Sequence, residues 1–157
     1  MAKKNLLIKT TKNIAKKRFD GTTYKSSLEK TMAMYLKSNG LPINYETKTF
    51  ILTPEQEATI ESWKRPANNN KSKFKNRIGK KIKRITYTPD FVDDEKHFNK
   101  TGSFVIEVKG YPTPYFNLKY KMFEHYCQER YKNITLYMPR TVADCQEVAD
   151  LIAERYV

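Results

Sequence analysis

The sequence lacks the features that would place a chain in a membrane or outside the cell. No stretch of its 157 residues approaches the 18 uninterrupted apolar residues of a membrane-spanning helix. The lysine-containing start, MAKKNLLIKTTKN, has no apolar segment long enough for secretion. There are two cysteines, Cys127 and Cys145, in stretches with helical periodicity, which favours buried thiols in a reducing compartment over a disulfide framework or metal knuckle. We therefore expect a cytoplasmic protein with no membrane partner.

Acidic residues are scarce in the first half of the chain. The whole sequence has 30 Lys and Arg against 17 Asp and Glu, a formal net charge of +13. Residues 1–88 hold 21 basic and 6 acidic side chains, whereas residues 89–157 hold 9 and 11. Such a basic half is expected where the partner is a phosphate backbone, although charge alone would equally fit a ribosomal protein or a membrane-surface binder.

The hydrophobic pattern predicts a mixed α/β domain, and the chain is long enough for one proper core. Helices are expected over residues 24–39, 115–131 and 141–156, the last with Thr141 and Asp144 as a capping box. Strands are expected over residues 43–52, 85–92, 104–109 and 133–138. Because a helix would connect the last two strands, we expect a right-handed crossover and a mixed sheet.

Three segments lie outside this pattern. Residues 1–23 are basic and predict an N-terminal arm, which leaves 24–157 as a single domain. Residues 53–63 begin with TPE, which predicts a short helix. Residues 64–84 hold ten basic residues and no acidic one, and they form either a solvated loop or a phosphate-contacting insertion. We favour the insertion, because ten uncompensated cations repel one another unless an anion screens them.

The stretch FVIEVKG, residues 104–110, places two charges in an apolar strand. Glu107 and Lys109 are two residues apart and would point to the same face. Burying a lone charge is costly, so the pair needs each other, a metal or a functional cleft. Pro89-Asp90 ends the neighbouring predicted strand, so the carboxylates of Asp90 and Glu107 can converge. With waters they would make an all-oxygen site of the kind that Mg²⁺ prefers, and Lys109 could approach a scissile phosphate.

Pro89-Asp90, sixteen intervening residues and then Glu107-Val108-Lys109 resemble the PD-(D/E)xK nuclease superfamily. Over roughly residues 18–138 the chain is also similar to phage Holliday-junction resolvases of the endonuclease I type, and the matching stretches are SSLE at 26–29, YE at 45–46, YTPDF at 87–91 and EVKG at 107–110. The resemblance implies a restriction-endonuclease-like core, with a mixed central sheet of about four strands flanked by helices. The chain departs from the resolvase pattern in its long basic insertion and its C-terminal helix.

This resemblance implies a Mg²⁺-dependent DNA endonuclease, with Mn²⁺ able to substitute, that hydrolyses phosphodiester bonds of branched DNA in recombination. Asp90 and Glu107 would bind the metal, Glu29 would assist them, and Lys109 would position or activate the water. Glu29 has an alternative role as an exposed helix residue paired with Lys25 or Lys30. The 24–157 segment would then be a single nuclease domain. A four-way junction needs two symmetric cuts, so a homodimer is the natural oligomer, in the host-cell cytoplasm if a bacteriophage encodes it.

The residues expected to contact DNA are Lys64, Arg65, Lys71, Lys73, Lys75, Arg77, Lys80, Lys81, Lys83, Arg84, Lys119 and Lys121. Two other functions stay open: a nicking or restriction-like nuclease on duplex DNA, and a non-catalytic basic nucleic-acid-binding protein. In a non-catalytic nucleic-acid-binding protein, the carboxylates would have purely structural roles.

Five further side chains carry less weight. His97 and His125 could act as bases, but exposed or packing roles are favoured for both. Glu46 lies near the expected site or faces solvent and is not chosen. Tyr111 and Tyr115 could stack on unpaired bases.

Overall fold

The computed structural model describes residues 17–66 and 73–156. The chain divides into two compact units: residues 17–48 with 88–156 form the first, and Thr49–Tyr87 form the second. Residues 1–16 of the expected N-terminal arm lie outside the described residues. The described part of that arm pairs as a small antiparallel hairpin, β1 (Arg18–Phe19) with β2 (Thr22–Thr23).

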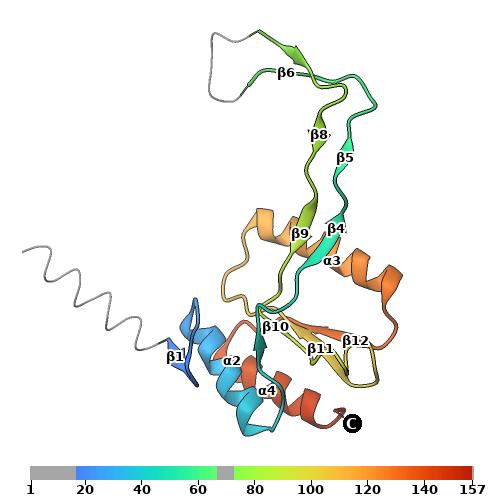
Figure 1. The fold of residues 1–157 in the computed structure, drawn as a ribbon. Coiled ribbons are helices and arrows are strands. Elements are labelled where there is room, and N and C mark those ends of the chain that lie inside the picture. The colour runs from blue at the N-terminus through green and yellow to red at the C-terminus, as the bar shows by residue number, and fades with distance from the viewer. Residues whose placement is uncertain (1–16, 67–72, 157) are drawn as a thin grey trace, which may run out of the picture. The chain divides into compact units, whose positions relative to one another are not determined.

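The first unit is built on a four-stranded mixed sheet, which confirms the predicted α/β class (Figure 1). Its strand order is β12 (Ile134–Tyr137), β11 (Ser103–Ile106), β10 (Phe91–Val92) and β3 (Asn44–Tyr45). β10 runs antiparallel to both β11 and β3, whereas β11 and β12 are parallel. The parallel pair is connected through α3 (Pro114–Arg130), as the helix between two predicted strands required.

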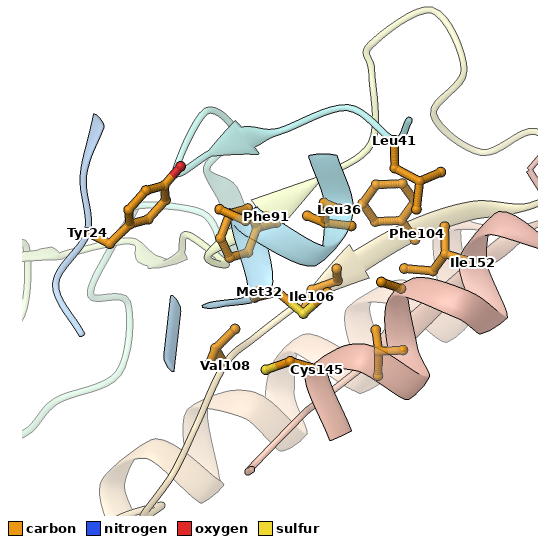
Figure 2. Close-up of a cluster of buried hydrophobic side chains, with 13 residues drawn as sticks. Tyr24, Met32, Leu36, Leu41, Phe91, Phe104, Ile106, Val108, Cys145 and Ile152 are labelled. Carbon is orange, nitrogen blue, oxygen red and sulfur yellow. The ribbon is translucent and has the colours of Figure 1, made fainter. Parts of the chain in front are cut away.

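Two helices pack together against one face of this sheet, and α3 lies on the other side (Figure 1). They are α2 (Ser27–Ser38) and α4 (Val142–Ala153). Met32 and Leu36 of α2 meet Cys145 and Ile152 of α4 in one cluster with Phe104, and all five are buried (Figure 2). Burial of an apolar side chain of this size stabilises the fold by roughly 1.5–3 kcal/mol.

The helix starts follow local sequence rules. The Ser26 hydroxyl accepts the N–H of Glu29 at 3.1 Å and caps α2. Thr141 and Asp144 exchange side-chain and backbone hydrogen bonds at the start of α4, which confirms the predicted capping box.

Alternation along β11 decides which residues reach the core. Phe104, Ile106 and Val108 belong to the cluster with α2 and α4. Val105 and Glu107 therefore point to the opposite face, the side on which α3 lies (Figure 1). The apolar positions anchor the strand, and that anchoring holds Glu107 in place.

The second unit is a two-stranded antiparallel ribbon. Its pairs are β4 (Phe50–Thr53) with β9 (Ile85–Tyr87), β5 (Gln56–Glu57) with β8 (Lys81–Ile82), and β6 (Trp63–Lys64) with β7 (Lys75–Asn76). The helix predicted over residues 53–63 is wrong, because this segment pairs across the ribbon instead. Its TPE start signal is local, and the pairing of Gln56 with Ile82 overrides it.

Two predicted strands are interrupted rather than continuous. Residues 43–52 divide into β3 and β4, and Glu46 between them has a φ of 52°, which ends the regular strand. Residues 85–92 divide into β9 and β10, with Pro89 and Asp90 between them. These breaks separate the sheet of the first unit from the ribbon.

The two cysteines are free and buried, as predicted. Burial raises the pKa of Cys127 to about 12 and that of Cys145 to about 11, so both stay protonated thiols at neutral pH. No helix among residues 17–66 and 73–156 has the length and apolar character to cross a membrane.

We predict that Gly102→Ala destabilises the first unit strongly. Gly102 has a φ of 84°, and a Cβ built there would lie 2.2 Å from the Arg155 carbonyl oxygen. The substitution combines backbone strain of about 1–2 kcal/mol with overpacking of roughly 1–3 kcal/mol. The midpoint of urea denaturation measures the loss.

Gly40→Ala is the matched control, because Gly40 has a φ of 69° and a Cβ built there would meet no other atom within 4 Å. It should lose only the backbone-strain part of the free energy of unfolding. Equal losses in the two variants would show that the contact with Arg155 is not tight.

Candidate functional site

Asp90 lies where β10 and β11 cease to pair through their backbones. The last backbone pair of these strands joins Phe91 and Ile106. One step beyond it, the Asp90 Oδ2 accepts the N–H of Val108 at 2.7 Å, so a side chain replaces the missing strand partner. The chain after Ile106 stays tied to the neighbouring β12 segment as well, since the Glu107 N–H donates to the Tyr137 carbonyl at 3.0 Å.

The strand register brings three acidic residues side by side. The pairing of Phe91 with Ile106, continued by one residue, sets Asp90 opposite Glu107. On the other side, the Glu46 N–H donates to the Asp90 carbonyl at 2.8 Å. Acidic residues from three neighbouring chain segments therefore meet at one end of the sheet.

The carboxyl of Asp90 is electrostatically strained. Burial, and then the negative charge of Glu107, raise the pKa of Asp90 from 3.8 to about 8. The hydrogen bond from Val108 acts in the opposite direction, and the charges of Glu29 and Glu46 add to the increase. A carboxyl with this pKa is mostly protonated at pH 7, and a nearby cation would favour its ionised form.

Glu29 enters the site from α2. Its Oε2 accepts the Tyr45 hydroxyl at 2.6 Å and the Lys25 backbone N–H at 3.1 Å. Only 7% of Glu29 is exposed, compared with 9% of Asp90 and 8% of Glu107. Glu29 is thus neither an exposed helix residue nor a partner of the Lys25 ammonium, which pairs with Glu46 instead.

Tyr45 and Glu46 are the neighbours that sequence reasoning did not select. Burial and the hydrogen bond to Glu29 raise the pKa of the Tyr45 hydroxyl, so it stays protonated and donates. The YE pair is one of the matching stretches of the resemblance, but strand alternation places Glu46 toward solvent. The positive φ of Glu46 breaks that alternation, and no simple sequence pattern predicts a positive φ at a glutamate.

Lys109 is half-buried beside α3. Its backbone N–H donates to the Pro139 carbonyl at 3.0 Å, and its Nζ lies 4.5 Å from the centre of the Phe116 ring. Such a contact attracts an ammonium toward the aromatic face. Glu107 also faces α3, because its charge contributes to raising the pKa of Tyr120.

The donor chemistry of this site suits a hard divalent cation. Within the described residues, no three carboxylate, histidine or cysteine side chains are arranged so that they could hold a metal ion. Asp90 and Glu107 nevertheless offer oxygen donors only, which is the donor type that Mg²⁺ prefers. Burial and, after it, the negative charge of Glu107 raise the pKa of Asp90, and a bound cation would favour the ionised form against both.

The remaining sequence candidates are distributed over both units. The described cations expected to bind DNA are all exposed or partly exposed: Lys64, Arg65, Lys73, Lys75, Arg77, Lys80, Lys81, Lys83 and Arg84 in the ribbon, and Lys119 and Lys121 on α3. Lys71 lies outside the described residues. His125 is exposed, whereas His97 contacts the buried carboxylate of Asp93 and packs on Tyr156 with ring centres 4.4 Å apart.

Comparison with known proteins gives a family without an assigned activity. The chain belongs to the family described as "Protein of unknown function (DUF1064)", whose profile matches residues 10–142. That range includes Glu29, Asp90, Glu107 and Lys109. No curated protein and no solved structure matches the chain.

We predict that Asp90→Asn changes how stability depends on pH. In the folded protein Asp90 keeps its proton up to about pH 8, whereas the unfolded chain releases it near pH 3.8. The folded state therefore binds more protons between these values, and wild-type stability falls as pH rises through this window. Asparagine cannot ionise and can still accept the Val108 N–H. Relative to wild type, the free energy of unfolding of the variant should therefore rise by roughly 1–3 kcal/mol between about pH 5 and pH 8.

Urea denaturation at a series of pH values across this window, in the presence of EDTA, measures this difference. Glu95→Gln removes an exposed carboxylate outside the site and serves as the control. Parallel pH profiles for wild type and Asp90→Asn would contradict the electrostatic strain assigned to Asp90.

Proposed function

We propose that this protein is a metal-dependent DNA endonuclease with a restriction-endonuclease-like core, acting on branched DNA as a homodimer. The observation that carries the proposal is the pair Asp90 and Glu107, two buried carboxylates set opposite each other by the β10–β11 register. A structural ion pair between Glu107 and Lys109 explains the two charges of the strand but not the elevated pKa of Asp90. Like charges placed together inside a protein are typical of functional sites.

The sheet gives the proposal its second support. An antiparallel hairpin carries Pro89-Asp90 and Glu107-Val108-Lys109, and a helix then leads to a parallel strand. This order is the one expected from the resemblance to PD-(D/E)xK nucleases.

Asp90 and Glu107 would hold Mg²⁺, and Glu29 would assist them. A bound Mg²⁺ supplies positive charge that neutralises the phosphate and acidifies a water molecule. Tyr45 keeps the Glu29 carboxylate oriented through its 2.6 Å hydrogen bond. Tyr45 is therefore a positioning residue rather than a catalytic one.

Lys109 would stabilise the negative charge that grows on the phosphate oxygens. Hydrolysis forms a P–O bond to a water oxygen and breaks the P–O bond to the leaving sugar oxygen, which takes up a proton. A preorganised cation next to these oxygens lowers the barrier without moving during the reaction. In this structure the Lys109 Nζ lies over the Phe116 ring, so a cation–π contact holds the side chain on the face of the strand that carries Glu107.

A cleavage assay tests the function directly. The protein is incubated with a four-way junction, a linear duplex and a single strand, each with Mg²⁺ or EDTA. Paired cuts near the branch in Mg²⁺ support the proposal, and equal cutting of the linear duplex would favour a restriction-like nuclease instead. Binding without any cleavage would overturn both enzymatic assignments.

We predict that Asp90→Asn and Glu107→Gln abolish cleavage while DNA binding is retained or tightened, because each removes an oxygen donor to the metal and adds no negative charge next to phosphate. Lys109→Ala should lower the cleavage rate by roughly 10²–10³-fold, the usual effect of losing one charge-stabilising group. Junction binding is measured in EDTA and cleavage in Mg²⁺. Glu95→Gln should cut at the wild-type rate, and wild-type cutting by either site variant would refute the assignment.

A further inference from the structure

The ribbon unit, Thr49–Tyr87, contains a hollow lined by cations. Its volume is about 340 Å³, and five basic side chains line it: Lys64, Arg77, Lys80, Lys81 and Lys83. No acidic side chain lines it among the described residues. Lys81 is compensated by an ion pair with Glu55 at 3.0 Å, and the other four form no ion pair within residues 17–66 and 73–156.

A bend in the ribbon creates this hollow. The Ala58 N–H donates to the Lys80 carbonyl, and the Gly79 N–H donates back to the Ala58 carbonyl, both at 2.8 Å. Gly79 has a φ of 71°, which turns the chain sharply between β7 and β8. The backbone therefore fixes the curvature, while the cationic side chains around it stay exposed.

A second observation also points to an anion. Lys64 and Lys75 are direct cross-strand partners near the end of the described ribbon. Like charges directly opposite each other destabilise a strand pair, and a two-stranded ribbon without a covering layer is only marginally stable in water. Screening of the two ammonium groups by phosphates would remove this cost.

The ribbon also presents an aromatic side chain in a fixed orientation. Trp63 is 58% exposed, yet its indole N–H donates to the Glu61 Oε1 at 2.8 Å. The same oxygen accepts the Asn76 amide at 3.0 Å, which ties both strands to one carboxylate. Trp63 is the only tryptophan of the chain and neighbours Lys64 of the hollow.

We propose that the ribbon is a duplex-DNA-binding arm, and that the hollow at its bend receives phosphates of the DNA backbone. A two-stranded ribbon has the width that the major groove of B-DNA admits. Exposed cations on both strands would meet the phosphates that border the groove. This inference rests on the proposed function and deepens it by giving DNA a contact distinct from the acidic site, but its test requires no cleavage.

The binding test uses the full chain in EDTA with a labelled DNA duplex of about two helical turns, and measures affinity over a range of salt concentrations. The test variant is Arg77→Gln/Lys80→Gln, which keeps the backbone hydrogen bonds of the bend. The control is Lys96→Gln/Lys132→Gln, which removes the same charge from exposed positions of the first unit. The slope of log K against log salt should fall by roughly 2 in the test variant and stay unchanged in the control.

Trp63 supplies a readout located on the ribbon itself. Adding unlabelled duplex should change the intrinsic Trp63 fluorescence at low salt, and high salt should reverse the change. Equal salt slopes in the test and control variants, or DNA binding that leaves Trp63 emission unchanged, would overturn the proposal. Tighter binding to vesicles of anionic lipid than to duplex would overturn it too.

The two proposals fail separately. If the ribbon variant has the same salt slope as the control while the wild-type protein cleaves DNA, the ribbon is not the DNA-binding arm and the nuclease assignment stands. A normal ribbon response in a protein that never cleaves would identify a DNA-binding protein whose carboxylates have another role. The Trp63 fluorescence of the DNA-free ribbon variant should match that of wild type, which verifies that the substituted ribbon is folded.

Discussion

The hydrogen bond from the Val108 N–H to the Asp90 carboxyl ties together the two chain segments that carry Asp90 and Glu107. Pro89, which precedes Asp90, has no N–H and cannot continue the β10 ladder. The Asp90 side chain takes the place of a backbone acceptor and keeps the chain after Ile106 extended. Because of this, Glu107 and Lys109 remain bonded to the β12 side, at the Tyr137 and Pro139 carbonyls. Hydrogen bonds on both sides of the strand therefore fix the backbone of Glu107, and only its side-chain rotamer is left to set the position of the carboxylate.

The same hydrogen bond exposes a conflict between folding and electrostatics. A carboxylate accepts an N–H best when it is ionised, and the Val108 contact does favour the anion. Burial and the charge of Glu107 outweigh that contact, because the resulting pKa of about 8 lies above the usual value. The fold thus holds Asp90 where its ionised form is unfavourable unless a cation lies nearby. Retaining such an arrangement at the cost of stability is typical of sites that bind or react.

The parts of the fold that follow local rules could be predicted from sequence, and those set by distant partners could not. The capping box of Thr141 and Asp144 belongs to α4 alone and the apolar spacing of α2 to that helix alone, so the local sequence shows each of them. The TPE stretch after residue 52 has an equally good local helix signal, but it pairs with a strand far along the chain, Gln56 with Ile82, and that pairing outweighs it. The site divides in the same way: the approach of Asp90 to Glu107 could be predicted from a hairpin, whereas the support of Glu29 by Tyr45 joins two elements across the core.

The division of charge between the two units suits the proposed action on DNA. An acidic cluster that concentrates negative charge repels a polyanion, so it cannot supply the affinity for DNA on its own. Cations must provide that affinity from elsewhere, and they must not neutralise the carboxylates by pairing with them. The charge distribution would fit both requirements, because nine of the described cations belong to the ribbon, which has its own backbone pairing and only three acidic residues, Glu55, Glu57 and Glu61. The ribbon's poor internal packing is consistent with this role, because a surface that binds an extended anion has to leave its cations exposed rather than bury them in a second layer.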